Sequence, residues 1–322
     1  MTKLVPRILE REFPDPPAVW GGRALEAVLG ISIPADRAGE SWELYDRPEG
    51  STRLRGTDQT VADLMRADAA SLLGAAVAAR SPDRFPISLK FLDAASPLSV
   101  QVHPDDDQAS EDGDGGKSEA WLVLHSGDNA RMARGLREGV DESEFARVAN
   151  TAEVMDCLQV FRPNVGDAVY LPAGTVHTIG PDVLVFEIQT NSALTYRMYD
   201  WDRDRELQVD QALRAVRYDR EPQTTVEPAP DGDGGEWVIC DAGFRVRRLT
   251  LEGPYTVGTQ GSFKVLTLLS GRAAVGWRSQ GEEEPLVVES PDSVLVPACI
   301  EEVFLSPVGS VTILVSDAGS GG

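Results

Sequence analysis

The chain has 322 residues, of which 42% are hydrophobic and 25% are charged, as in an ordinary globular protein. Its formal net charge is -22, and only four of its thirty basic residues are lysines. So acidic a surface repels nucleic acid and anionic membranes, which excludes both as expected partners, and no stretch approaches the length of a membrane span.

The amino-terminal residues and the cysteines indicate a cytoplasmic protein. The opening stretch, MTKLVPR, contains no apolar run of the kind found in a secretory signal. Cys157, Cys240 and Cys299 are odd in number and widely spaced, and they form no CxxC pair. Each is therefore predicted to be a small core residue rather than a ligand or a disulfide partner.

The first part of the chain is predicted to consist of strands with one helical insertion. Prolines and glycines punctuate short apolar runs between residues 5 and 56, as they do between strands. Apolar residues at helical spacing between residues 61 and 76 predict a helix, which residues 83–86 stop. Residues 87–92 then form a strand that leads into the segment 97–106.

The segment 97–106 carries the first candidate ligands. Its alternation predicts a half-buried strand whose polar face holds Ser99, Gln101 and His103. On that face an amide oxygen and an imidazole stand two residues apart, so they can converge on one point. Because the chain has only 3 histidines, the place of each one is informative.

A loop rich in glycine and aspartate follows, over residues 105–116. Its aspartates suggest a calcium loop, but the glutamate at the twelfth position and the flanking helices are lacking, so a solvated loop is predicted. A helix is predicted over residues 142–148. Strand patterns recur roughly every eight to twelve residues, which is typical of antiparallel sandwiches and barrels; they cover residues 118–124, 168–171 and 183–189.

The last third of the chain repeats the pattern of the first strands. After a predicted helix over residues 205–217 and a linker rich in proline, glycine and acidic residues, short strands return. LVLHSG and GDAVYLPA in the first part are echoed, in the same order, by LTLLSG and PDSVLVPA. This internal repeat predicts two copies of one β-barrel module.

The two copies differ in their chemistry. The repeat aligns Glu119 with Phe263 and His177 with Glu302, and the second copy contains no histidine, so any metal belongs to the first. The predicted organisation is a metal-binding catalytic barrel with small helical insertions over residues 1–220, a linker over 221–236, and a second, metal-less barrel over 237–322.

Four residues are candidates for one metal site. Two imidazoles and a carboxylate, joined by a neutral amide oxygen, suit zinc with open positions for water or substrate. Mixed nitrogen and oxygen ligation also admits manganese, iron or cobalt. The candidates are His103, Glu119, His177 and Gln101. An anionic substrate would also need local positive charge against the acidic background.

Four motifs resemble those of type I phosphomannose isomerases (mannose-6-phosphate isomerases), particularly the shorter bacterial form: PLSVQVHPDD, GKSEAW, YLPAGTVHTIG and FEIQTNSALTYRMYDWDR, in this order. Residues 19–22, 39–43 and 91–94 support the match, which runs from about Trp20 to the end of the chain. The resemblance implies a mainly β fold of two cupin-like jelly-roll β-barrels with a few peripheral helices. It also implies one divalent metal ion, usually zinc, and interconversion of mannose 6-phosphate and fructose 6-phosphate.

The resemblance implies roles for individual residues, carried over to the matching positions. As metal ligands it implies Gln101, His103, Glu119 and His177. As catalytic residues it implies Arg197, Lys117 and Glu187, and as substrate-binding residues Ser99, Lys117 and Arg197. The expected substrate is a small anionic sugar phosphate.

The chemistry of an aldose–ketose isomerase requires such groups. Proton transfer through a cis-enediol(ate) needs a base and a group that stabilises oxyanion charge. A guanidinium can stabilise the enediolate and a lysine can pair with phosphate, and the sequence does not settle which cation does which. Glu187 is a candidate base or a carboxylate that orients a ligand, so the base is left open between Glu187 and a metal-bound water or relay.

One departure from the family pattern keeps alternatives open. Ala193 stands where family members often have an aspartate, which allows a different substrate preference. The alternatives are an isomerase of another sugar or sugar phosphate and a non-catalytic cupin that binds a sugar or a metal. Retention of all four ligand types with Lys117 and Arg197 argues against the non-catalytic alternative. The oligomeric state is left open, with a monomer as one option.

Overall fold

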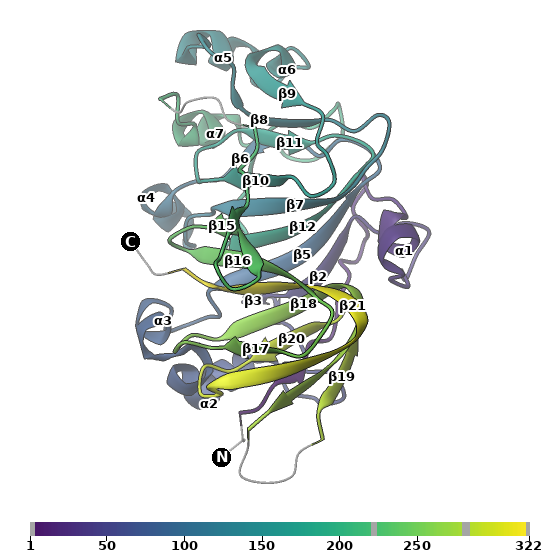
Figure 1. Cartoon of the computed structure of the whole chain (residues 1–322). Helices are drawn as coiled ribbons and strands as arrows, with labels where there is room; N and C mark the ends of the chain where they lie inside the picture. The colour runs from purple at the N-terminus through teal and green to yellow at the C-terminus, as the bar shows by residue number, and fades with distance from the viewer. Residues whose placement is uncertain (1–3, 220–223, 279–283, 320–322) are drawn as a thin grey trace.

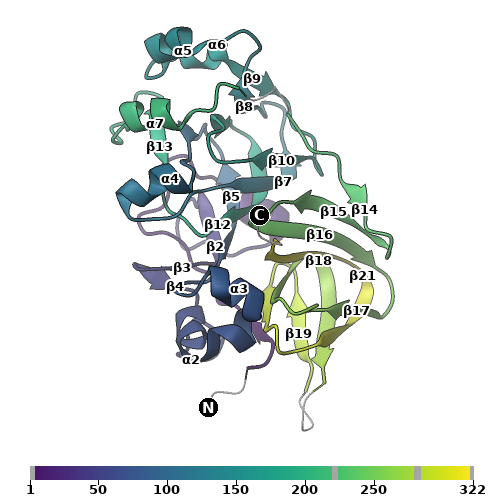
Figure 2. The same ribbon diagram turned by 90° about the vertical axis from the view of Figure 1, so that its left-hand side faces the viewer.

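Antiparallel strands make up most of the protein, and short helices lie at its periphery (Figure 1, Figure 2). The structure is a computed structural model that describes residues 4–219, 224–278 and 284–319. The mainly β class predicted from the sequence is confirmed. Within these described ranges, no helix combines the length and the apolar character needed to span a membrane.

Two five-stranded sheets face each other in the part of the molecule that carries the candidate ligands. Their strand orders are β10-β7-β12-β5-β2 and β13-β6-β11-β8-β9. Apolar side chains from both sheets, such as Trp121 and Met132, pack together between them. The first sheet consists of β2 (Glu40–Leu44), β5 (Ile87–Ala94), β7 (Glu119–Ser126), β10 (Ala168–Leu171) and β12 (Val183–Thr190). The second consists of β6 (Val100–Val102), β8 (Met132–Leu136), β9 (Leu158–Phe161), β11 (His177–Ile179) and β13 (Tyr196–Tyr199).

The third large sheet has nine strands and carries the carboxy-terminal half. It surrounds a core of its own, in which side chains from many of its strands pack. Its strands are β1 (Arg7–Ile8), β14 (Ala229–Pro230), β15 (Gly235–Cys240), β16 (Phe244–Leu251), β17 (Tyr255–Gly258), β18 (Lys264–Trp277), β19 (Leu286–Glu289), β20 (Ser293–Val296) and β21 (Glu302–Ala318). A small hairpin, β3 (Asp46–Arg47) with β4 (Gly50–Ser51), stands apart from these sheets.

Strand β1, far from the other strands of this sheet in the sequence, also belongs to the third sheet. Strand β1 pairs antiparallel with β20, so that Arg7 lies opposite Leu295. The predicted linker contributes strand β14, while residues 221–223 at its start lie outside the described residues. The division into 1–220, 221–236 and 237–322 therefore stays a prediction, with one strand of the first part inserted in the sheet of the last.

Short helices lie around the sheets, as Figure 2 shows for α2, α3 and α4. They are α1 (Ala24–Leu29), α2 (Val61–Leu73), α3 (Ala75–Arg80), α4 (Asp106–Ala109), α5 (Glu142–Val148), α6 (Val154–Cys157) and α7 (Val209–Ala215), with a 3-10 turn over Ser110–Asp112. The predicted helix over residues 205–217 is thus shorter at both ends. The loop over residues 105–116 was predicted without helices, yet α4 and the 3-10 turn form within it.

The helix predicted between residues 61 and 76 is interrupted at Gly74. A capping box between Thr60 and Asp63 starts α2, and α3 begins after Gly74, whose φ is +89°. A Cβ at this position would lie 1.9 Å from the carbonyl oxygen of Gly261. Glycine is therefore required where the α2–α3 corner approaches the carboxy-terminal sheet.

The outer face of the first sheet packs against the third sheet and joins the two halves in one core. Phe186 and Leu122 lie in this core with Phe263 and Val265. The register pairs Leu171 with Glu119 and Val296 with Lys264. Phe263 therefore points into the core between the two halves. Lys264 lies on the other face of β18, together with Leu266, which packs in the core of the third sheet.

Four predictions about single residues are wrong. The equivalence of Glu119 with Phe263 fails by one residue, because Lys264 has the matching register position. The equivalence of His177 with Glu302 fails likewise, since Val303 and not Glu302 packs in the second core. Cys157 is buried as predicted, but Cys240 and Cys299 are exposed, because one ends β15 and the other lies in the turn after β20.

Candidate metal centre

Strands from both facing sheets bring the four predicted ligands together. Gln101 is the central residue of β6, and its neighbours Val100 and Val102 pack on the opposite face, against the helices. His177 begins β11 directly opposite Gln101, and Glu119 begins β7 in the facing sheet. His103 follows β6 by one residue, so the alternation of the predicted strand places it beside the same point.

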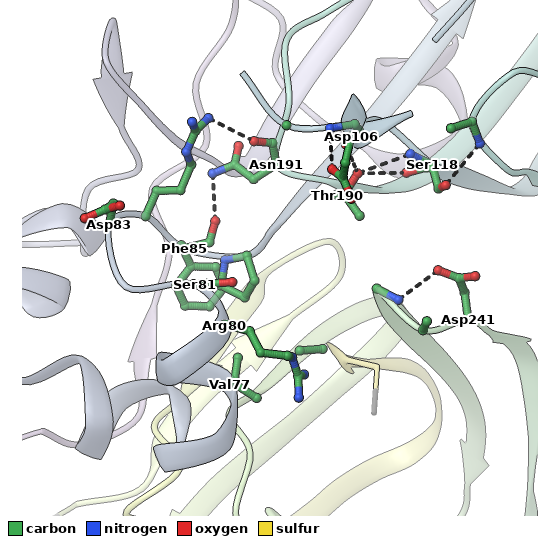
Figure 3. A pocket seen from close by; sticks show the side chains of 18 of the residues that line it. Val77, Arg80, Ser81, Asp83, Phe85, Asp106, Ser118, Thr190, Asn191 and Asp241 are labelled. Atoms are coloured by element: carbon green, nitrogen blue, oxygen red, sulfur yellow. Dashed lines mark hydrogen bonds between the residues drawn. The ribbon is translucent and has the colours of Figure 1, made fainter. Parts of the chain in front are cut away.

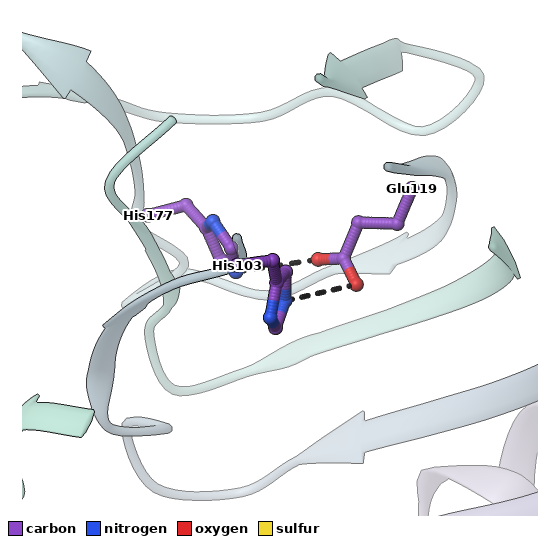
Figure 4. A group of neighbouring side chains, drawn as sticks. All are labelled: His103, Glu119 and His177. Atoms are coloured by element: carbon purple, nitrogen blue, oxygen red, sulfur yellow. Dashed lines mark ion pairs between the residues drawn. The ribbon is translucent and has the colours of Figure 1, made fainter. Parts of the chain in front are cut away.

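Glu119 faces both imidazoles from one side (Figure 4). Nε2 of His103 lies 3.3 Å from Oε2 of Glu119, and Nε2 of His177 lies 3.3 Å from Oε1. The candidate ligand atoms of these three residues all lie within 4.8 Å of one another. None of the three residues is more than 2% exposed.

The cluster contains buried polar atoms that have no hydrogen bond. Nε2 of His103 and both carboxylate oxygens of Glu119 have no hydrogen-bond partner among the described residues. Oε2 of Glu119 forms an ion pair with Lys117 at 2.9 Å, and because buried polar atoms are normally paired, the remaining atoms require an explanation. A divalent cation satisfies them, and two imidazoles with a carboxylate are ligands that zinc and related ions accept. The residues present therefore fit a metal ion.

Charge and burial hold the cluster in the protonation state that binds a metal. Burial lowers the pKa of His103 to about 3, and Lys117 adds to this effect. Burial also lowers the pKa of His177, against the opposing effect of Glu119. Burial alone would raise the pKa of Glu119, but Lys117 and the imidazoles lower it well below its ordinary value. The imidazoles are neutral and the carboxylate is charged at neutral pH, as metal ligation requires.

Backbone carbonyls orient both imidazoles. Nδ1 of His103 donates a hydrogen bond of 2.8 Å to the carbonyl oxygen of Leu194. Nδ1 of His177 donates one of 2.8 Å to the carbonyl oxygen of Thr175. Because each Nδ1 carries the proton, each Nε2 presents its lone pair to Glu119.

The amide of Gln101 lies at the cluster with its nitrogen toward His177. The distance between Nε2 of Gln101 and Nε2 of His177 is 3.2 Å, and Oε1 of Gln101 accepts a hydrogen bond of 3.0 Å from Ser99. The oxygen and nitrogen of such an amide exchange places by a flip about the last torsion. Ser99 therefore adjoins the predicted ligand, and because a hydroxyl can donate to Oε1 or accept from Nε2, it can hold the amide of Gln101 in either orientation.

Lys117 and Glu187 border the cluster from the first sheet. Nζ of Lys117 lies 2.9 Å from Oε2 of Glu119. Glu187 is buried and accepts a hydrogen bond of 3.0 Å from the indole nitrogen of Trp121. Burial and the nearby Glu119 raise the pKa of Glu187, against Lys117 and Lys90. A carboxylate with a raised pKa beside a metal centre is suited to accept a proton.

Arg197 lies in the same row as two predicted ligands. Strand register places it opposite Gln101, which in turn lies opposite His177. Residues paired in this way point to one face of a sheet. Its buried Nε has no hydrogen-bond partner among the described residues, and burial lowers the pKa of the guanidinium. A cation without a partner is available to an anionic ligand at this face.

The structure adds two cationic residues that the sequence analysis missed. Lys90 lies opposite Glu187 in β5, with Nζ 4.0 Å from Glu187 and 3.2 Å from Glu40. Arg134 lies opposite His177 in β8 and donates a hydrogen bond of 2.6 Å to the carbonyl oxygen of Tyr170. A single lysine inside the otherwise apolar strand of residues 87–92 was a signal for the first. No sequence pattern marks Arg134, and only the pairing of β8 with β11 places it beside His177.

A separate polar cavity of about 600 Å³ lies where the two halves meet (Figure 3). Its walls come from the end of α3, the acidic loop and the turn before β16, and include Arg80, Asp106, Asn191 and Asp241. Of the candidate metal ligands described above, none lines it. Ser118 and Gly116 lie in its wall, so the segment that carries Lys117 separates this cavity from the metal centre.

Comparison with known proteins gives consistent matches. Residues 17–129 match the family model described as "Phosphomannose isomerase type I, catalytic domain". Mannose-6-phosphate isomerase ManA of Bacillus subtilis is 32% identical over 267 residues, which cover 79% of this chain and 82% of that protein. Probable mannose-6-phosphate isomerase GmuF of the same organism is 34% identical over 66% of this chain and 68% of its own length. A crystal structure of mannose 6-phosphate isomerase from Bacillus subtilis matches with a TM-score of 0.85 and 26% identity, over 97% of this chain and 99% of that one.

Facing antiparallel sheets that enclose a buried cluster of two histidines and a glutamate define a cupin-type protein with a cluster that could hold a metal ion. The relatives fix the family more closely. The chain belongs to the type I phosphomannose isomerases, the mannose-6-phosphate isomerase family.

Proposed function

We propose that this protein interconverts mannose 6-phosphate and fructose 6-phosphate in a metal-dependent reaction. The observation that carries the proposal is the buried cluster of His103, Glu119 and His177, whose orphaned atoms face one point in a member of this family. Gln101, His103, Glu119 and His177 would hold the ion, with Oε1 of Gln101 turned inward. A bound divalent ion would supply Lewis-acid polarisation of substrate oxygens at this point.

The proton moves between two neighbouring carbons of the open-chain sugar. A base removes the proton from C2 of the aldose, a double bond forms between C1 and C2, and O1 gains a proton. The hydroxyl at O2 then loses its proton, the C2 carbonyl forms, and C1 is protonated. We assign the base to Glu187, because it is buried, has a raised pKa, and adjoins Glu119 through the neighbouring strand.

The two predicted cations have different tasks in this proposal. Lys117 lies 2.9 Å from Glu119, so its charge keeps that carboxylate ionised. Arg197 has an unpaired buried Nε and can therefore stabilise negative charge on the substrate. Ser99 fixes the amide of Gln101 and borders the position of the sugar.

Zinc is the proposed ion, because two imidazoles and a carboxylate with a neutral oxygen suit it. The acidic overall charge makes the local cations Lys117, Arg197 and Lys90 the groups that recognise a sugar phosphate. The cytoplasmic location stays a prediction from the sequence, and the oligomeric state stays open, with a monomer as one option.

A coupled assay with mannose 6-phosphate and with unphosphorylated mannose, before and after chelation, tests the proposal. We expect turnover of the phosphorylated sugar, its loss on chelation and its return with zinc. Activity on the free sugar alone would favour the alternative of another sugar substrate. Turnover that survives thorough metal removal would overturn the mechanism.

A further inference from the structure

The acidic loop over residues 105–116 is anchored to the fold by three of its aspartates. Asp105 forms an ion pair with Arg217. Asp112 accepts a hydrogen bond of 2.6 Å from the hydroxyl of Tyr196. Asp114 lies 2.6 Å from Nη1 of Arg84. The loop was predicted to be solvated, but these three contacts attach it to the rest of the fold.

The carboxylate of Asp114 holds the turn that precedes β13. Its Oδ2 accepts hydrogen bonds of 3.0 Å from the backbone nitrogen of Ala193 and 3.2 Å from the hydroxyl of Ser192. The Ser192 hydroxyl also accepts a hydrogen bond of 3.2 Å from the nitrogen of Leu194. One carboxylate thus fixes three consecutive residues.

This turn is in direct contact with the metal centre. The carbonyl oxygen of Leu194 accepts the hydrogen bond from Nδ1 of His103 at 2.8 Å. A continuous series of contacts therefore runs from Arg84 through Asp114 and the turn to His103. The carbonyl of Ser192 is also held by Gln189 and Arg47, so loss of the Asp114 carboxylate should release mainly the backbone of Ala193 and Leu194.

We propose that Asp114 is a positioning residue for the metal ligand His103. By fixing the backbone of Ala193 and Leu194, Asp114 holds the carbonyl that sets the ring orientation and tautomer of His103. Groups that orient a metal-bound imidazole in this way strengthen metal binding without touching the ion. The inference rests on the proposed function only in that the cluster binds a metal ion.

The side chain of Asp114 is 16% exposed, so its replacement does not leave a hole in a closed core. Asp107 provides a matched control, because it is an exposed aspartate of the same loop. Asp114→Ala removes every contact of the carboxylate. Asp114→Asn keeps an oxygen that accepts from the Ala193 nitrogen but loses the charge that pairs with Arg84.

The experiment measures zinc affinity of chelator-stripped full-length protein by competition with a chelating indicator. We expect Asp114→Ala to weaken zinc binding about 10-fold. Asp107→Ala should stay within twofold of wild type, and Asp114→Asn should fall between the two. Thermal unfolding of the metal-free proteins distinguishes a loss of positioning from a loss of stability. If Asp114 only positions His103, metal-free Asp114→Ala should unfold at the same temperature as metal-free Asp107→Ala.

The proposal is overturned if Asp114→Ala binds zinc as tightly as Asp107→Ala, or if its loss of affinity follows a lower metal-free unfolding temperature. If Asp114→Ala does not fold, Asp114→Asn decides, and an affinity equal to that of Asp107→Asn overturns the proposal. Failure of wild-type protein to bind zinc would instead contradict the proposed function, so the two failures are distinguishable.

Discussion

Nε1 of Trp121 donates a hydrogen bond of 3.0 Å to Oε2 of Glu187. The same ring meets the imidazole of His177 edge to face, with an interplanar angle of 80° and 5.4 Å between centroids. The tryptophan therefore fixes the proposed base relative to a metal ligand on the facing sheet. Because the hydrogen bond favours the ionised carboxylate, it lowers the pKa of Glu187 against the stronger effect of burial.

Trp121→Phe should shift the pH dependence of the reaction. The variant keeps a ring between Glu187 and His177 but loses the N–H donor, so the pKa of Glu187 should rise further. The acidic limb of the kcat/KM profile should then move to higher pH, because the base must be ionised. The profile of Trp121→Phe, recorded beside wild type, checks this. An unmoved acidic limb would remove Glu187 from the role of base.

Glu187→Gln should be more stable than wild type and nearly inactive. The amide can still accept from Trp121, so the hydrogen bond is kept, while the base is lost; kcat should fall by about 10² to 10⁴. Burial and Glu119 raise the pKa of Glu187 in the folded state, so its ionisation opposes folding.

The stability difference should depend on pH in a defined direction. With a folded-state pKa above the unfolded one, the wild type loses stability as pH rises through the ordinary value of about 4.3 and then through the raised value. The advantage of Glu187→Gln should therefore be absent at low pH and complete above the raised pKa. Urea unfolding of the chelator-stripped proteins at several pH values measures it. Equal stability at pH 7 would contradict the raised pKa.

Metal should stabilise the folded protein as well as support turnover. An ion that binds only the folded state contributes about 2.7 kcal/mol at a concentration 100 times its Kd. Addition of zinc to chelator-stripped protein should therefore raise the unfolding temperature. His177→Ala serves as the control and should show a much smaller rise. A rise of the same size in that variant would place the ion elsewhere.

Arg197→Ala should lower kcat by at least about 10², because the guanidinium is proposed to stabilise developing charge. The fold should persist, since the side chain is only half-buried and its backbone contacts with Gln208 remain. Arg214→Ala, an exposed arginine in α7, is the matched control. Steady-state kinetics and circular dichroism measure both. A near-normal kcat for Arg197→Ala would remove the residue from the mechanism.

Gly74→Ala should destabilise the protein more than Gly56→Ala. Both glycines have positive φ, +89° at Gly74 and +73° at Gly56, but only at Gly74 would a Cβ meet another backbone, at 1.9 Å. Backbone strain should cost each variant about 1 kcal/mol. The clash with Gly261 should add at least about 1 kcal/mol at residue 74. The difference between their free energies of unfolding in urea measures the contact between the halves.

The sequence predicted the parts of the site that lie on one strand or one motif. Alternation around Gln101 and His103 placed both on one face, because a strand orients side chains with a period of two residues. The register between strands could not be predicted from the sequence. The positions of Lys90 and Arg134 at the cluster, and the side of β18 on which Lys264 lies, depend on that register and could not be predicted either. Register depends on pairing between distant segments, so a local pattern does not encode it.

The contacts of the acidic loop over residues 105–116 also could not be predicted from the sequence. Aspartates without apolar neighbours predict a solvated segment, and composition contains no information about Arg84 or the turn at Ala193. These partners lie far away along the chain, and only the closed fold brings them to Asp114. Polar contacts of this kind have no periodicity that a sequence pattern can report.

The pairing of β1 with β20 has a consequence for synthesis of the chain. Residues 7–8 are synthesised long before their partners, residues 294–295. This edge of the third sheet therefore stays incomplete until those partners have been made. Since domains generally fold as they emerge, the half with the candidate ligands can assemble first, while strand β1 waits for β20.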